Sequence, residues 1–264
     1  MTKKTKVSII ITAEKKENYI ERAIKSCINQ SYNNIETIVV YTELTNNRIL
    51  KKKFSSKKIK FLNIREKLKI PTQDQLFKIY KSLKFSKGQY IFLMDGDDAF
   101  QKNKISSILK NKSKKKIMYL DNFKEINNKN KKIIKMTRPK RNKIYRKLIN
   151  SWPKGICTSC ISIDRALLIE FFKKIKIKNY KYLAVDALLT IYFSIELKFF
   201  QTDKILTKKY NVSNSVDDKF TGIFNKFFWL RRLEQHDFYN SLTKNQITNL
   251  DSILTKVIYF FIKK

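Results

Sequence analysis

Short apolar runs alternate with amphipathic stretches over the first hundred residues. The runs at 7–11 and 35–40 are rich in Val and Ile, and the stretch between them repeats apolar residues at helical spacing. This order predicts a βαβ unit with parallel strands. Two further strands are predicted at 59–64 and 90–94, with a helix between them that opens on a capping box at Thr72.

The second half of the chain is less regular. Residues 122–135 are rich in Lys and Asn, which predicts a loop or a weak edge hairpin. The other predicted elements are a strand at 161–163, a helix capped by Asp164, a helix at 185–195, a strand at 205–210 and closing helices at 222–242 and 246–262. The pattern therefore predicts an α/β fold with a Rossmann-like, mainly parallel sheet flanked by helices.

The chain is strongly basic, with 58 Lys and Arg residues against 22 Asp and Glu and a formal net charge of +36. Such a field attracts polyanions. The lysines are spread through nearly every segment, whereas a nucleic-acid-binding protein concentrates them on one face. We therefore expect phosphate-bearing ligands or an anionic surface rather than a nucleic acid as partner.

Cysteine content and apolar runs indicate the compartment. Three cysteines do not suggest a disulfide scaffold. The basic start leads into too short an apolar run for a signal peptide, and no run is long enough to span a bilayer. We expect a cytoplasmic protein. The closing helix would suit peripheral contact with the anionic inner face of the membrane, but an amphipathic helix packed on the domain is the favoured interpretation.

Three carboxylates follow the fourth predicted strand, in the run Asp95-Gly96-Asp97-Asp98. Like charges this close repel unless a cation lies between them, and Mg²⁺ or Mn²⁺ prefers oxygen ligands. The run also lies at the carboxyl end of a strand, where parallel sheets bind ligands. An acidic turn before a helix near Lys104 explains the same residues, so the pattern alone leaves both interpretations open.

The opening of the chain resembles family 2 glycosyltransferases of the GT-A fold. The resembling segments are the strand Val7–Ile11, the helix through Ala23–Tyr32, the strand Asn34–Val40 and the approach to the family's DxD metal motif, Ser86–Asp98. The resemblance implies a GT-A domain over 1–220, with a nucleotide-sugar half at 1–121 and an acceptor half at 122–220. Residues 221–264 would form a C-terminal helical extension.

The resemblance also implies a donor and a cofactor. A nucleotide-diphosphate sugar would be the donor, and Mg²⁺ or Mn²⁺ would neutralise the departing diphosphate. Asp95 would contact the donor ribose and the metal, Asp97 would ligate the metal, and Asp98 would support the turn. The acceptor would be a hydroxyl of a glycan or of a lipid-linked sugar.

The residues that hold the nucleobase in this family are altered here. Thr12 and Glu14 stand in the turn where the family usually has Pro and Asn. After the second strand, only Glu43 can replace the family's acidic residues. These three side chains are candidate donor contacts, and the identity of the base stays open.

Asp186 is the candidate general base. The segment 182–189 resembles the family's acidic pair at the start of a helix, with Val185 in place of the first acid. An inverting transfer needs such a base to take the proton from the acceptor hydroxyl. The alternative is an aspartate that only complements the helix dipole.

Several basic residues are candidate ligands of phosphate or metal. Arg231, Arg232 and Lys78 could contact the diphosphate, and His236, the only histidine, could reach the metal or be a bystander on its helix. The pair Cys157 and Cys160 has CxxC spacing, but no second pair completes a zinc site, so we expect no such function.

Two other functions compete with sugar transfer. A sugar-phosphate nucleotidyltransferase would share the sheet and the metal, but it needs a glycine-rich loop after the first strand, and residues 12–18 contain no glycine. A catalytically degenerate GT-A domain that binds polyanions or nucleotides is the non-enzymatic alternative.

Overall fold

The computed structural model describes residues 4–14, 17–43, 47–55, 59–110, 117–136, 152–196, 198–211, 219–243 and 250–263. The first half contains β1 (Val7–Ala13), α1 (Glu17–Ile28), β2 (Ile35–Tyr41), α2 (Asn47–Lys53), β3 (Ile59–Asn63), α3 (Pro71–Ser82) and β4 (Tyr90–Asp95). These elements confirm the predicted βαβ unit and the third and fourth strands.

The second half adds the remaining strands and five of the described helices. Its elements are β5 (Ala99–Phe100), α4 (Lys104–Lys110), β6 (Met118–Asn127), β7 (Ile133–Met136), β8 (Ile161–Asp164), α5 (Arg165–Lys174), α6 (Val185–Ile195), β9 (Phe199–Asn211), α7 (Lys226–Leu242) and α8 (Leu250–Ile262). A 3₁₀ turn, η1 (Thr158–Cys160), precedes β8. The first residues of the predicted last helix, 246–249, lie outside the described residues.

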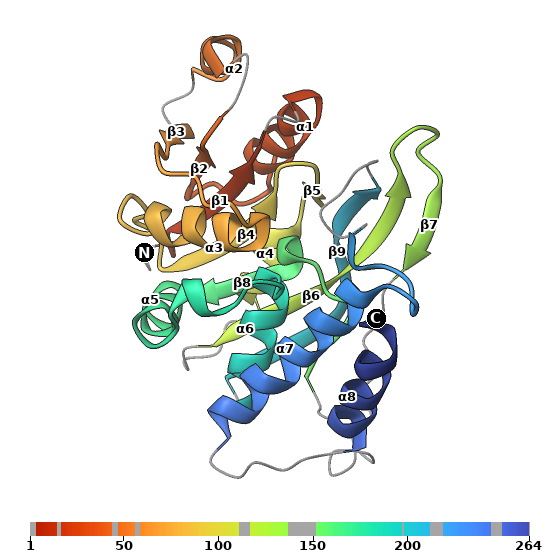
Figure 1. Ribbon diagram of the computed structural model, residues 1–264. Coiled ribbons are helices and arrows are strands. Elements are labelled where there is room, and N and C mark those ends of the chain that lie inside the picture. Colours follow the sequence, from red (N-terminus) through yellow and green to blue (C-terminus); the bar gives the residue numbers. More distant parts are fainter. Residues whose placement is uncertain are drawn as a thin grey trace.

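One mixed sheet runs through the molecule in the order β3-β2-β1-β4-β8-β6-β9-β5, with β7 paired to β6 (Figure 1). β3, β2, β1 and β4 are parallel, as the crossover helices require. β8 then pairs antiparallel to β4. Helices cover both faces, so the expected α/β class with a Rossmann-like half is confirmed.

Apolar side chains form a core on each side of the sheet. One cluster joins the sheet to α3, α5 and α6, and the other joins it to α1, α2 and α4. β1 alternates between the two, because Ile10 belongs to the first cluster while Ile9 and Ile11 belong to the second. The strand is therefore buried on both faces, which explains its unbroken apolar sequence.

One prediction about local structure is confirmed in part and one is wrong. Residues 122–136 do form a hairpin, because β6 pairs antiparallel with β7, but β6 also runs beside β8 and β9 and is therefore not an edge strand. α3 begins at Pro71 without a side-chain cap, so Thr72 opens no capping box. The Thr72 hydroxyl instead donates to the carbonyl oxygen of Lys181, 2.9 Å away, which ties α3 to the segment before α6.

The Asp164 cap is confirmed: its carboxylate accepts a hydrogen bond from the backbone N–H of Ala166 at 2.9 Å. Among the described helices, none is both long and apolar enough to cross a membrane.

Candidate active site

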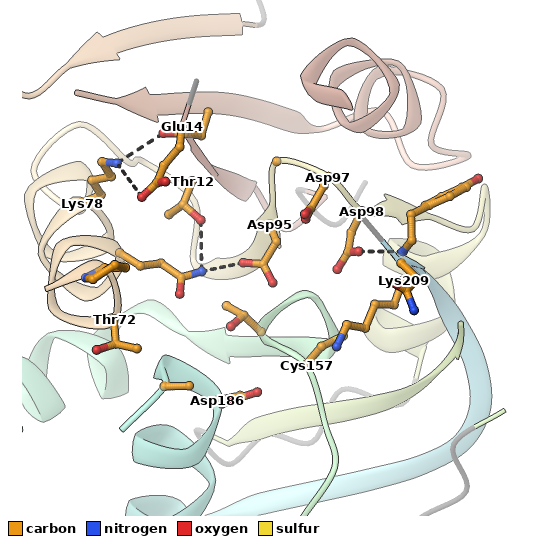
Figure 2. A pocket seen from close by; sticks show the side chains of 18 of the residues that line it. Thr12, Glu14, Thr72, Lys78, Asp95, Asp97, Asp98, Cys157, Asp186 and Lys209 are labelled. Atoms are coloured by element: carbon orange, nitrogen blue, oxygen red, sulfur yellow. Dashed lines mark hydrogen bonds and ion pairs between the residues drawn. The ribbon is translucent and has the colours of Figure 1, made fainter. Parts of the chain in front are cut away.

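The acidic run lies at the edge of the sheet where the parallel strands end. β1 and β4 are in register there, with Thr12 opposite Asp95. A cavity of about 390 Å³ opens at this edge and is lined by all three carboxylates of the run. Asp186, at the start of α6, lies across the same cavity (Figure 2). The acidic run and Asp186, about 90 positions apart in the chain, therefore line the same cavity.

Asp95 is fixed by its neighbours. Its carboxylate accepts a hydrogen bond from Gln75 Nε2 at 2.5 Å, and its backbone N–H donates to Ser159 Oγ at 3.0 Å. Burial and the nearby charges of Asp98, Asp97 and Asp186 raise the pKa of Asp95 well above its usual range. A carboxylate in this position favours a cationic partner.

Asp98 faces inward and holds the turn. Its carboxylate accepts from Ser159 Oγ at 2.6 Å and from the backbone N–H of Tyr210 at 3.2 Å. Burial, together with the charge of Asp97, raises the pKa of Asp98 to about 7. Since Ser159 bonds both Asp95 and Asp98, this hydroxyl connects the acidic run to the turn before β8.

The segment before Asp186 is held by a carboxylate of α7. Glu234 accepts hydrogen bonds from the backbone N–H groups of Lys181, Tyr182 and Leu183, at 2.6–2.8 Å. These residues lead directly into α6, whose first turn contains Asp186. The start of α6 is therefore fixed by α7 as well as by the Thr72 contact.

Basic side chains border the acidic run. Lys209, on β9, lines the cavity and partly offsets burial by lowering the pKa of both Asp95 and Asp98. Arg22 Nη2 donates to the carbonyl oxygen of Asp97 at 2.5 Å, and the guanidinium lies 3.4 Å from the Tyr210 ring centroid. The negative charge of the site is thus only partly compensated by the chain itself.

A family comparison covers the segment that contains the acidic run. Residues 78–176 match the model described as Glycosyl transferase family 2. Over this segment, the chain is similar to glycosyl transferase family 2. None of the curated proteins compared with the chain matches it in sequence.

Solved structures share the whole fold of this chain at low sequence identity. S. aureus TarS 1-349 in complex with UDP-GlcNAc has a TM-score of 0.63 and 14% identity, covering 98% of this chain and 71% of that one. The complex of the same TarS fragment with UDP gives 0.62 and 13%, covering 98% and 70%. The mannosyltransferase PcManGT from Pyrobaculum calidifontis, in complex with GDP-Man and Mn²⁺, gives 0.63 and 9%, covering 98% and 70%.

Several of the predicted donor contacts do line the cavity. Thr12, Glu14, Lys78 and Arg231 are among its lining residues. Lys78 is buried, and its ammonium forms an ion pair with Asp74 at 2.7 Å. Much of its charge is thereby neutralised within the protein.

Arg231 is positioned from two sides. Its Nε donates to the carbonyl oxygen of Tyr182 at 3.0 Å, and its guanidinium lies 3.5 Å from the Phe220 ring centroid. The arginine therefore reaches the cavity from α7 and also contacts the segment before α6.

Three other predicted contacts lie elsewhere. Glu43 is about half exposed and pairs with Lys67 at 3.6 Å, away from the cavity lining. Arg232 forms an ion pair with Asp251 of α8. His236 is 1% exposed and lies against Trp152 and Asp251, so the structure does not bring it to the acidic run.

The structure adds site residues that the sequence does not reveal. Gln75, Ser159 and Lys209 contact or face the acidic run, yet none has a distinctive sequence pattern. Cys157 also lines the cavity, 3.5 Å from the sulfur of Cys160, and both are free thiols. Burial raises the pKa of Cys157 well above its usual range, so this pair is not arranged as a thiolate site.

A buried ion pair lies behind the acidic run. Lys104 of α4 and Asp121 of β6 are fully buried, with Nζ and Oδ1 2.7 Å apart. Lys104 Nζ also donates to the carbonyl oxygen of Ser159 at 2.5 Å and to Thr207 Oγ1 at 2.8 Å. These contacts connect α4, β6, β9 and η1 at Ser159, whose hydroxyl bonds both Asp95 and Asp98.

Proposed function

We propose that this protein is a glycosyltransferase that moves a sugar from a nucleotide-diphosphate donor to an acceptor hydroxyl with the help of Mg²⁺ or Mn²⁺. The observation that carries the proposal is the acidic run facing Asp186 across one cavity. The likeness to proteins solved with UDP-GlcNAc and with GDP-Man and Mn²⁺ supports a nucleotide-sugar donor and a divalent cation.

The carboxylates at this site suit a divalent cation that prefers oxygen ligands. Asp95 and Asp97 offer carboxylates, and the raised pKa of Asp95 and Asp98 reflects burial first and the neighbouring negative charges second. No group of three or more His, Cys, Asp or Glu side chains is arranged as a metal site within the described residues. Mg²⁺ or Mn²⁺ takes one or two carboxylates and completes its shell with substrate phosphates, so Asp95 and Asp97 would be its ligands from the protein. When bound, such an ion stabilises negative charge on the leaving diphosphate.

The other side chains have roles that follow from their positions. Arg231 would contact the diphosphate, and Thr12 and Glu14 would border the donor at the end of β1. Asp186 would accept the proton of the acceptor hydroxyl as its oxygen attacks the sugar carbon. Attack on the face opposite the bond to the diphosphate, which breaks as the new bond forms, would invert that carbon. The acceptor would be a glycan or a lipid-linked sugar.

Titration calorimetry with UDP, GDP and other nucleoside diphosphates, with and without Mn²⁺, tests the donor site. We expect one nucleotide to bind more tightly with Mn²⁺, and Asp97→Ala to reduce that gain at least about tenfold because one cation ligand is lost. Glu170→Ala is the matched control, because Glu170 is an exposed carboxylate paired with Lys174. Metal-dependent binding that survives Asp97→Ala unchanged would rule out the assigned site.

A further inference from the structure

α8 buries its hydroxyl side chains and exposes its apolar ones. Ser252 and Thr255 are each 1% exposed, and Thr255 Oγ1 lies 3.3 Å from His236 Nε2 in the contact with α7. Six large apolar side chains of this helix are 45–72% exposed: Leu250, Ile253, Leu254, Val257, Phe260 and Phe261. Their spacing places these six residues on one stripe of the helix, which we call the α8 surface. A helix packed on a protein core normally buries its apolar side chains and exposes its polar ones.

Cations border this stripe. Lys256 and Lys263 are exposed, and Lys263 Nζ lies 4.5 Å from the Phe260 ring centroid. The one acidic residue of α8, Asp251, is bonded by Arg232 of α7 and lies 3.5 Å from Lys154 Nζ. The α8 surface is therefore apolar with a cationic edge, and no carboxylate of the helix is available to repel an anionic partner.

We propose that the α8 surface docks on an anionic lipid bilayer. A helix with exposed Phe and Leu on one side and Lys at the border matches the chemistry of the interface between lipid headgroups and acyl chains. Charge decides between a bilayer and a second copy of the chain, because two copies with a net charge of +36 repel each other while an anionic surface attracts them. The docking does not depend on the proposed sugar transfer.

Co-sedimentation with vesicles tests the proposal. We expect the chain to sediment with vesicles of equal parts phosphatidylglycerol and phosphatidylcholine, and far less with phosphatidylcholine alone. Phe260→Ser combined with Phe261→Ser should lower the partition coefficient about tenfold or more, because two large apolar groups no longer enter the interface. The matched control is Phe85→Ser, since Phe85 is 49% exposed in a segment remote from α8 in the sequence, and it should not change the partition.

Folding and nucleotide binding are checked separately. Circular dichroism checks whether the double variant is folded. If the double variant is unfolded, Phe261→Ser alone is used instead, because Phe261 is 72% exposed and contributes little to packing. Metal-dependent nucleotide binding should be the same in wild type and variant, so a failed donor site and a failed docking surface give different results. Equal sedimentation of wild type and variant would overturn the proposal. So would a wild-type dimer that the variant converts to a monomer, because it would assign the α8 surface to a second copy.

Discussion

The carboxylates of the cavity determine what the site can bind. Burial and mutual repulsion raise the pKa of Asp95 and Asp98, so negative charge is held there at a free-energy cost. Lys209 offsets part of this cost, and the rest favours an added cation. An acidic turn that only begins α4 would place its side chains in solvent, whereas Asp98 is 2% exposed and Asp95 is bonded by Gln75.

Asp186→Asn should separate donor binding from sugar transfer. The amide cannot accept the acceptor proton, so we expect turnover to fall by roughly 10²–10⁴-fold while metal-dependent nucleotide binding is retained. Release of nucleoside diphosphate from the bound donor, in the presence of acceptor, measures turnover. Asp164→Asn is the control, because it also alters a carboxylate at a helix start but lies outside the cavity lining. Lost nucleotide binding in Asp186→Asn would instead indicate a structural role.

His236 should contribute a pH-dependent part of stability. Burial lowers the pKa of His236 from 6.5 to about 4, despite the opposing charge of Asp251. The unfolded chain therefore takes up a proton first as the pH falls below 6.5, and the native state loses up to about 3 kcal/mol by pH 4. Urea unfolding of wild type and His236→Gln should show a stability difference that grows from pH 4 to pH 7. A constant difference would contradict this prediction.

Local sequence patterns predict helices and strands better than they predict the contacts between these elements. The βαβ unit and the α5 cap follow from apolar spacing and one aspartate, because those signals lie within a few residues of each other. The sequence at Thr72 has the capping-box pattern, but the hydroxyl bonds Lys181, more than a hundred residues away. About half of the residues in β6 and β9 are polar or charged, so the spacing of apolar residues does not predict that these strands pair within the sheet.

The same distinction applies to the candidate site. Asp95, Asp97 and Asp186 were expected together because the family resemblance supplies a spatial order that spacing alone lacks. His236 and Arg232 were expected at the site only because of their position late in the chain. On a helix, a shift of one residue rotates the direction of the side chain by about 100°. Arg231 consequently reaches the cavity, while Arg232 faces α8.

The buried Lys104–Asp121 pair should behave as a unit that joins α4 to the sheet. Lys104→Met leaves the Asp121 carboxylate buried without its cation, so we expect a loss of about 3–5 kcal/mol in the free energy of unfolding. Lys104→Met combined with Asp121→Leu removes both charges and should recover much of that loss. Urea unfolding of wild type and the two variants measures these changes in the free energy of unfolding. If the double variant is as unstable as the single one, packing rather than charge is responsible.

At the scale of the whole molecule, charge opposes the fold. A net charge of +36 repels itself in the compact state, while the sheet and its two apolar cores hold the chain together. The described ion pairs are mostly exposed, and such pairs contribute little each. Stability should therefore depend on ionic strength more than in a protein of balanced charge.

Added salt should raise the melting temperature. Between about 0.02 and 0.3 M NaCl the screening length shrinks enough to weaken repulsion between separated lysines, and we expect a rise of roughly 2–6 °C. Scanning calorimetry at fixed pH measures it. A variant with six exposed lysines changed to glutamine provides the control: Lys51, Lys52, Lys84, Lys87, Lys102 and Lys110. Because self-repulsion grows with the square of the net charge, its response to salt should be roughly a third smaller. An equal response would show that salt acts through apolar burial instead of charge.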